Sequence, residues 1–135
     1  MGQRTHRFKV QVYYEDTDHS GVVYHANYLK YFERARESVI GPAALVALWK
    51  EKRLGFAVYK AGLNFLDGAE FGDTLEIVST VRKDSDYRLV WHQEAWRPGA
   101  VRPAVKAEIH LVCLDREKNL RPIPDVGIDF DGTKL

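Results

Sequence analysis

The sequence has little cysteine and lacks the common motifs of metal, phosphate and serine-hydrolase chemistry. Its single cysteine, Cys113, cannot form a disulfide within the chain, and its place in an apolar run indicates a buried small side chain. His19, His92 and His110 raise a metal alternative, but no HExxH or paired Cys/His spacing accompanies them. GxSxG, Gly-rich phosphate loops and Rossmann glycines are also absent. We therefore predict a protein with no metal site and no cofactor.

The chain also lacks an excess of charge and any long apolar run. Its formal net charge is +1, which gives no strong field toward nucleic acid or an anionic membrane. No stretch approaches the roughly 20 apolar residues that span a bilayer. The N-terminal MGQRTHRFKV has no apolar segment suited to a signal peptide. We expect a cytoplasmic protein without a nucleic-acid partner and without an integral membrane segment.

What is present is the composition of an ordinary globular domain. The chain has 135 residues, of which 45% are hydrophobic and 29% charged. This length predicts one domain over residues 1–135, large enough to bury a core without disulfides.

The first half of the chain predicts one strand and two helices. Apolar residues alternate over residues 8–14, which is typical of a half-buried strand. Residues 28–39 carry apolar side chains at helical spacing and predict an amphipathic helix. Gly41 and a following proline end this helix, and the proline can open a second one over residues 42–52. Gly55 is a plausible stop for the second helix.

The second half predicts strands alone. Apolar residues alternate within residues 59–65, 75–81, 87–93 and 105–113, with turn residues between these runs. Because strands and helices do not interleave, we predict an α+β fold, a five-stranded antiparallel sheet wrapped around one long helix. Such a sheet has open edges, which favours pairing in a dimer. The tail after Leu120 has no pattern, and we expect it to be loosely held.

An acidic segment before the long helix carries the strongest indication of chemistry. Glu15, Asp16 and Asp18 fall between the first strand and the helix. We interpret Glu15 and Asp16 mainly as turn and capping residues, because short oxygen side chains satisfy free backbone donors there. Asp18 precedes an apolar Val-Val-Tyr step. We expect apolar neighbours to raise the pKa of its carboxyl, as suits a nucleophile or general base.

The residues after Asp18 complete a candidate site. Free backbone N–H groups within residues 22–27 would point from the positive end of a helix at a carbonyl oxygen. Gly21 either allows close backbone approach to a ligand or is a turn glycine, and the two readings weigh about equally. His25 would orient Asp18, position a water or protonate a leaving group. Tyr14 lies in the same strand–turn–helix unit.

A second polar group lies in the predicted strands. His92 and Glu94 share one strand face, and Glu108 and His110 share another. If these strands pair, we expect the four to form a buried network or a subunit interface, with a structural role.

Residues 14–28, read as YEDTDHSGVVYHANY, closely resemble the signature of the 4-hydroxybenzoyl-CoA thioesterase family, and within it the Tol-Pal-associated acyl-CoA thioesterase branch. A second element, EFGDTLEI at residues 70–77, resembles the start of the family's third strand. The resemblance implies a hotdog fold, dimers assembled into homotetramers, active sites at subunit interfaces, and no metal. It implies Asp18 as the catalytic carboxylate, with Tyr14 and His25 completing the site and the His25 backbone N–H polarising the thioester.

The function hypothesis is hydrolysis of an acyl-CoA, or of an acyl carrier protein thioester, to free acid and thiol. We take Asp18, His25 and Tyr14 as catalytic. The residues expected to contact substrate are Gly21, Val22, Tyr24 and Tyr28. Asp18 acts either as nucleophile or as general base. The alternative is a non-catalytic acyl-CoA-binding or scaffold hotdog protein. Residues 66–69 depart from the family pattern, where a basic residue and a proline are frequent, and this bears on the rim of the substrate pocket.

Overall fold

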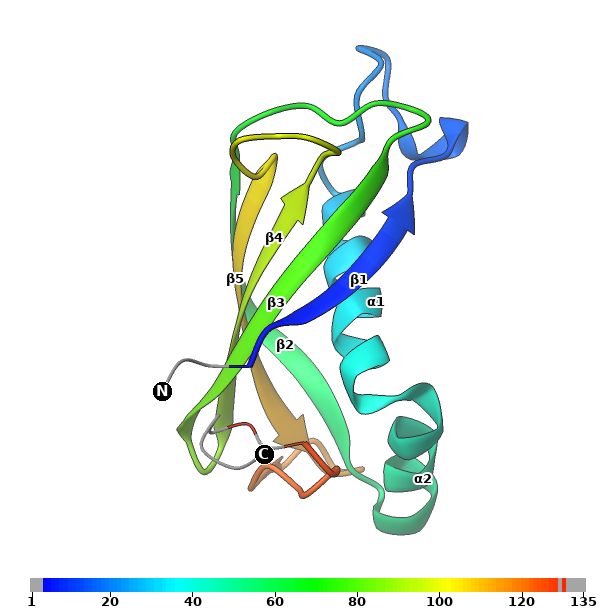
Figure 1. Cartoon of the computed structure of the whole chain (residues 1–135). Coiled ribbons are helices and arrows are strands. Elements are labelled where there is room, and N and C mark those ends of the chain that lie inside the picture. Colours follow the sequence, from blue (N-terminus) through cyan, green and yellow to red (C-terminus); the bar gives the residue numbers. More distant parts are fainter. Residues whose placement is uncertain (1–3, 129, 131–135) are drawn as a thin grey trace.

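The computed structural model describes residues 4–128 and 130. Five main strands form one antiparallel sheet in the order β1-β3-β4-β5-β2, and a short sixth strand, β6, pairs with β5. Figure 1 shows the sheet curving around helix α1, with helix α2 at the far end of α1. The elements in chain order are β1 His6–Gln11, a short 3-10 helix Tyr14–Asp16, α1 Asn27–Ile40, α2 Pro42–Lys52, β2 Gly55–Phe65, β3 Thr74–Ser85, β4 Arg88–Trp96, β5 Val105–Leu114 and β6 Leu120–Arg121. The predicted α+β architecture, an antiparallel sheet around one long helix, is confirmed, and β6 is an addition to it.

The core lies between α1 and the concave face of the sheet. Helix α1 buries Tyr28, Tyr31 and Phe32, which recur at helical spacing on one face. In β3 the buried positions alternate with partly exposed ones, as expected for a strand with one face on the core. The strands contribute further fully buried apolar side chains to this core, namely Leu75, Ile77, Leu89, Trp91 and Ile109.

Three sequence predictions need correction. The first strand ends at Gln11 rather than at residue 14, because the Asp16 carboxylate accepts a hydrogen bond from the Tyr13 N–H at 2.8 Å and turns the chain. Helix α2 does not stop at Gly55, which opens β2. It stops at Arg53, whose φ of 56° places it in the left-handed region and whose N–H bonds the Trp49 carbonyl at 2.9 Å.

The tail is the third correction. After Leu120 the chain pairs as β6 with the end of β5, and its apolar side chains then return to the core. Phe130 is only 5% exposed, and Ile123, Val126 and Ile128 pack against the core cluster. The expectation of a loosely held tail is therefore wrong for the described residues, because burial of four apolar side chains holds it in place.

The sheet has two edge strands, β1 and β2. Strand β2 exposes several large apolar side chains, including Val58, Tyr59 and Phe65, which are each about half exposed. An exposed apolar edge of this length is a template for pairing with another chain. No helix in the described part of the chain is long and apolar enough to cross a membrane.

Candidate active site

Asp18 lies at the tip of a small hairpin that leads into α1. Thr17 and Val23 form an isolated antiparallel bridge, and the Asp18 N–H bonds the Val22 carbonyl at 2.8 Å. The Gly21 N–H closes the turn on the Asp18 carbonyl at 3.0 Å. Gly21 has a φ of +87°, a conformation that side-chain-bearing residues rarely adopt. Gly21 is therefore a turn glycine whose N–H is already used.

The hairpin is anchored from both sides. Asp16 accepts hydrogen bonds on its backbone carbonyl from the Tyr24 N–H and the Asn27 side chain, both at 2.9 Å. On the other side, the Val23 N–H bonds the Ala69 carbonyl at 2.8 Å. The interpretation of Asp16 as a scaffold residue is confirmed. Glu15 is exposed, and no hydrogen bond to its side chain is present among the described residues.

Gly68 sets how closely the 66–70 segment approaches the hairpin. A Cβ built on Gly68 would lie 2.7 Å from the Val22 Cγ1 atom, far inside van der Waals contact. Segment 66–70, where the sequence departs from the family pattern, therefore supports the Asp18 hairpin directly.

The Asp18 carboxylate is held in its ionised form by Ser20. Its Oδ1 atom accepts hydrogen bonds from the Ser20 backbone N–H at 2.8 Å and from the Ser20 hydroxyl at 2.6 Å. The hydroxyl bond above all lowers the pKa of Asp18 below its usual value. The expectation of a raised pKa is wrong, because Asp18 is partly exposed and has two local donors. The backbone N–H of Val22 contributes in the same direction.

His25 stands at the start of α1 within a group of aromatic rings. Its ring centroid lies 4.5 Å from that of Tyr24 and 6.2 Å from that of Phe65, which also contacts Tyr28 at 6.0 Å. The His25 side chain is exposed, whereas Tyr28 is only 2% exposed and burial raises its pKa. Val22 is partly exposed and Tyr24 about half exposed. These rings form an apolar wall beside the helix N-terminus.

The backbone at this helix N-terminus retains free donors. Val23, Tyr24 and Asn27 direct their N–H groups to carbonyl oxygens of the protein. The N–H groups of His25 and Ala26 find no acceptor within the described part of the chain. They carry the positive end of the α1 dipole and can bind an oxygen of a ligand.

The predicted site residues lie around the N-terminal end of α1, but they do not contact one another. Tyr14 is 78% exposed and makes an edge-to-face contact with Phe71 at 6.0 Å. In the described part of this single chain, no hydrogen bond or ring contact links Tyr14, Asp18 and His25 to one another. Figure 1 places the segment that carries them at the N-terminal end of α1.

Sequence reasoning missed two supports of this site. Ser20 follows Asp18 by two residues, and this spacing is the signal of an Asx turn. The contact of Gly68 and Ala69 with the hairpin has no such signal, because nearly fifty residues separate the partners.

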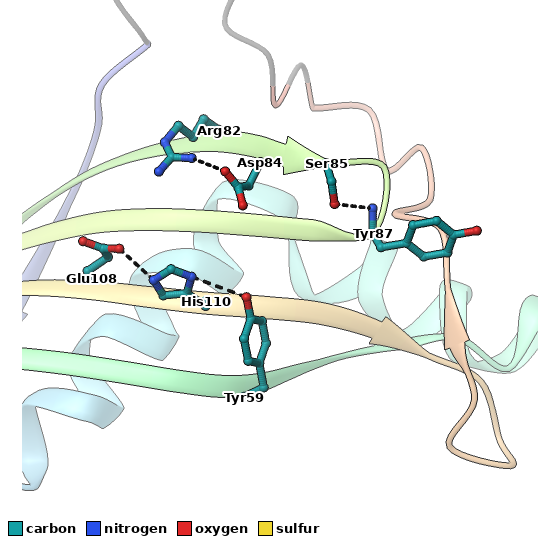
Figure 2. Close-up of polar contacts among 7 residues, drawn as sticks. All are labelled: Tyr59, Arg82, Asp84, Ser85, Tyr87, Glu108 and His110. Carbon is teal, nitrogen blue, oxygen red and sulfur yellow. Dashed lines mark hydrogen bonds and ion pairs between the residues drawn. The ribbon is translucent and has the colours of Figure 1, made fainter.

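The second polar group lies on the solvent-facing side of the sheet. His92 pairs in register with Glu108, and Glu108 accepts from or ion-pairs with His110 at 2.7 Å. Figure 2 shows Tyr59 of β2 reaching the other ring nitrogen of His110, at 3.5 Å. Because His92 and Glu108 are exposed, the prediction of a buried network is wrong, and the alternative of a subunit interface stays a prediction. Among the described residues, no cluster of three or more His, Cys, Asp or Glu side chains is arranged to hold a metal ion.

Comparison with known proteins identifies the family. The model of the thioesterase-like superfamily matches residues 12–128. The acyl-CoA thioesterase YbgC of Haemophilus influenzae is 33% identical over 118 residues, covering 86% of this chain and 85% of that protein. The acyl-CoA thioester hydrolase YbgC of Escherichia coli is 35% identical over 121 residues, covering 85% and 86%.

The fold is shared with a solved thioesterase. The crystal structure of a 1,4-dihydroxy-2-naphthoyl-CoA thioesterase from Synechocystis matches with a TM-score of 0.82 at 26% identity, and the match covers 91% of this chain and 92% of that one. These matches confirm the resemblance drawn from residues 14–28 and the hotdog fold that it implied. The chain belongs to the thioesterase-like superfamily of hotdog proteins.

Proposed function

We propose that this protein hydrolyses the thioester of an acyl-CoA, or of an acyl carrier protein, to a free acid and a thiol. One observation carries the proposal: an ionised carboxylate, Asp18, lies on a hairpin that runs directly into a helix N-terminus with free N–H groups. The pairing of a nucleophile or base with an oxyanion-binding backbone is what acyl transfer requires. Relatives named as acyl-CoA thioesterases support it.

An oxygen of the Asp18 carboxylate is the reactive atom of the proposed mechanism. In the nucleophilic route, this oxygen attacks the thioester carbonyl, the C–S bond breaks, the thiolate leaves, and water hydrolyses the resulting mixed anhydride. In the general-base route, the same oxygen takes a proton from water as the water oxygen attacks the carbonyl, and the tetrahedral intermediate then collapses, breaking the C–S bond and releasing the thiolate. Both routes place negative charge on the carbonyl oxygen, and both use the same donors.

The N–H groups of His25 and Ala26 supply those donors in the proposal. Held by the helix, they bind the developing oxyanion without having to reorganise. The His25 imidazole, exposed beside Tyr24, delivers the proton that the leaving thiolate needs. Gly21 shapes the turn. Val22, Tyr24 and Tyr28 contact the thioester end of the substrate.

The site is completed by a second subunit. Tyr14 is 78% exposed, so residues of its own chain do not hold it against a substrate. The outer, apolar edge of β2 has no partner strand within the described chain. Pairing of two β2 edges forms the dimer, and two dimers form a tetramer. We expect the assembly in the cytoplasm.

A thiol-release assay tests the proposal. Acyl-CoAs of different chain lengths, together with aromatic ones, are incubated with the protein, and free CoA is measured with a thiol reagent. We expect turnover of part of this panel. Saturable binding of acyl-CoAs without any release of thiol would replace the proposal with the acyl-CoA-binding or scaffold alternative.

Single-turnover hydrolysis in ¹⁸O-labelled water separates the two routes. The nucleophilic route leaves label in the Asp18 carboxylate whenever water attacks the aspartyl side of the anhydride, and mass spectrometry of the peptide detects it. The general-base route puts the label in the released acid alone.

A further inference from the structure

The hairpin that carries Asp18 leans on the segment 66–73, which joins β2 to β3. The Val23 N–H of the hairpin bonds the Ala69 carbonyl of the segment at 2.8 Å. Figure 1 shows the hairpin in blue, this segment in green and the β4–β5 loop in yellow, all at the N-terminal end of α1. Whatever holds the segment therefore also sets where the hairpin lies.

The first end of the segment is bonded to the β4–β5 loop, residues 97–104. The Ala104 carbonyl accepts hydrogen bonds from the Leu66 N–H at 2.7 Å and from the Asp67 N–H at 3.1 Å. The Arg102 guanidinium donates to the Leu66 carbonyl at 2.8 Å. Two of these three bonds join backbone groups, so the start of the segment is held mainly by the backbone.

The other end of the segment is closed as a turn by Asp73. Its Oδ2 atom accepts a hydrogen bond from the Glu70 N–H at 2.9 Å, and its own N–H donates to the Glu70 carbonyl at 3.1 Å. Glu70 in turn forms an isolated antiparallel bridge with Val22 of the hairpin. The Asp73 carboxylate thus fixes the shape of the turn that touches the hairpin.

Arg97, the first residue after β4, holds this turn from the neighbouring strand. Its Nε atom donates to the Asp73 Oδ2 atom at 2.8 Å, and its Nη2 atom lies 3.9 Å from the Glu70 Oε2 atom. The Arg97 and Asp73 side chains are 29% and 20% exposed, so water only partly competes with their bond. A charge-assisted hydrogen bond of this kind is stronger than a neutral one. Without Arg97, a largely shielded carboxylate would lose its cationic partner, which favours a rearranged turn.

We propose that Arg97 is a positioning residue of the Asp18 hairpin: it fixes the turn of the segment 66–73, and this turn fixes the hairpin. The assignment rests on the proposed thioester hydrolysis, for which it names a residue that acts without touching the substrate. A displacement of the reactive group near 1 Å can cost up to about 10²-fold in rate, so the contact with Arg97 should be visible in turnover.

Amide hydrogen exchange of the full-length protein, followed by NMR, tests the position of the hairpin without a substrate. Amides paired between β4 and β5 report global stability. In Arg97→Gln, exchange of the Val23 N–H should accelerate about tenfold relative to these amides, as expected for the loss of one charge-assisted hydrogen bond. If Val23 and the β4–β5 amides accelerated alike, Arg97 would only stabilise the fold, and the assignment would fail.

Arg82→Gln is the matched control. The Arg82 Nη1 atom bonds the Asp84 Oδ1 atom at 3.1 Å near the far end of β3 from Asp73, as Figure 2 shows for the pair. This variant removes an ion pair of the same type and should leave exchange at Val23 unchanged. Arg97→Lys keeps a charged donor near Asp73, so it should show a smaller acceleration than Arg97→Gln, and it serves if the glutamine variant does not fold. Acceleration at Val23 in Arg82→Gln equal to that in Arg97→Gln would overturn the assignment.

Turnover of two matched thioesters distinguishes positioning from a contact with the CoA phosphates. They are an acyl-CoA and the N-acetylcysteamine thioester of the same acyl group, which lacks the phosphates. We expect kcat of Arg97→Gln to fall about tenfold with both, and Arg97→Lys to recover part of the loss. A loss confined to the acyl-CoA and expressed in KM would make Arg97 a phosphate contact instead.

The two measurements separate this inference from the proposed function. If the wild type cleaves no thioester, the proposed hydrolysis fails, while amide exchange at Val23 still decides whether Arg97 holds the hairpin. If thioesters are cleaved and Arg97→Gln keeps full kcat, hydrolysis stands and the positioning assignment fails.

Discussion

The two ends of helix α1 differ in how the structure stabilises a charged side chain. At the N-terminal end, the Asp18 carboxylate is partly exposed and is stabilised by Ser20, two residues away in sequence. At the C-terminal end, Arg36 is buried and is held by Gln93 of β4, 57 residues away. A surface charge needs only local donors because water supplies the rest. A buried charge needs partners that the fold must bring to it.

The partners of Arg36 show how far this requirement extends. Gln93 accepts from Arg36, and its own amide donates to the Phe32 carbonyl and to the Ser79 hydroxyl, both at 3.0 Å. One glutamine therefore ties α1 to β3 and β4 through the core. The N-terminal end of α1 thus holds its charge by local bonds, and the C-terminal end holds its charge by bonds between elements.

Replacing the reactive carboxylate should produce the largest difference between the two ends. Asp18→Asn removes the charge and keeps the shape, so we expect kcat for acyl-CoA hydrolysis to fall by about 10²–10⁴-fold. Glu15→Gln, a carboxylate of the same segment without a hydrogen bond, is the control and should retain activity. Full turnover in Asp18→Asn would contradict the assignment of this end as the catalytic one.

Substitution of Gly68 tests whether activity depends on the position of the Asp18 hairpin. Gly68→Ala places a methyl group against the Val22 side chain and displaces the hairpin. A displacement near 1 Å can cost up to about 10²-fold in rate, so we expect a loss of kcat/KM between about tenfold and that limit.

Gly62→Ala is the matched control for this substitution, because a Cβ at Gly62 meets nothing within 4 Å. Equal activities of the two variants would show that the position of the hairpin is not critical.

The C-terminal end of α1, where Arg36 meets Gln93, should respond to substitution mainly through stability. Gln93→Met leaves Arg36 and the Phe32 carbonyl without their buried partner, and we expect the free energy of unfolding to fall by about 1–3 kcal/mol. Chemical denaturation measures it. Gln11→Met is the control: Gln11 also makes hydrogen bonds, with the Asp73 carbonyl and the Thr74 hydroxyl among others, but at an exposed position where water can replace them, so its loss should cost under about 1 kcal/mol. If Gln93→Met lowered the free energy of unfolding no more than this control, the buried hydrogen bonds of Gln93 would not contribute measurably to stability.

The smallest expected effect is a change in pH dependence. Ser20→Ala removes the hydroxyl that contributes most to lowering the pKa of Asp18, so that pKa rises toward its usual value. The ionised form is active above the pKa and is lost as pH falls through it. The acid limb of the kcat/KM profile should therefore move to higher pH in Ser20→Ala.

Ser38→Ala is the control for the pH profile, because the Ser38 hydroxyl bonds only the Ala35 carbonyl on α1. A profile that moves in neither variant, or that moves to lower pH in Ser20→Ala, would mean that another group governs the acid limb.

Much of the fold and the location of the reactive end were predictable because their signals are local. Apolar spacing predicted α1 and the main strands, and proline predicted the start of α2 at Pro42. The acidic segment and the family signature predicted where Asp18 and His25 would stand relative to α1. The pKa direction of Asp18 was not predicted, because reasoning from apolar neighbours overlooked the Ser20 turn.

By itself the sequence determined the main helices and strands, the family and the identity of the candidate residues, because these depend on spacing within a few residues. Tertiary structure alone decided which charges are buried, that Phe130 returns to the core, that Gly68 touches Val22, and that Arg97 bonds Asp73. Such contacts join residues far apart in the chain. They arise from packing between elements, and no periodicity or local motif encodes them.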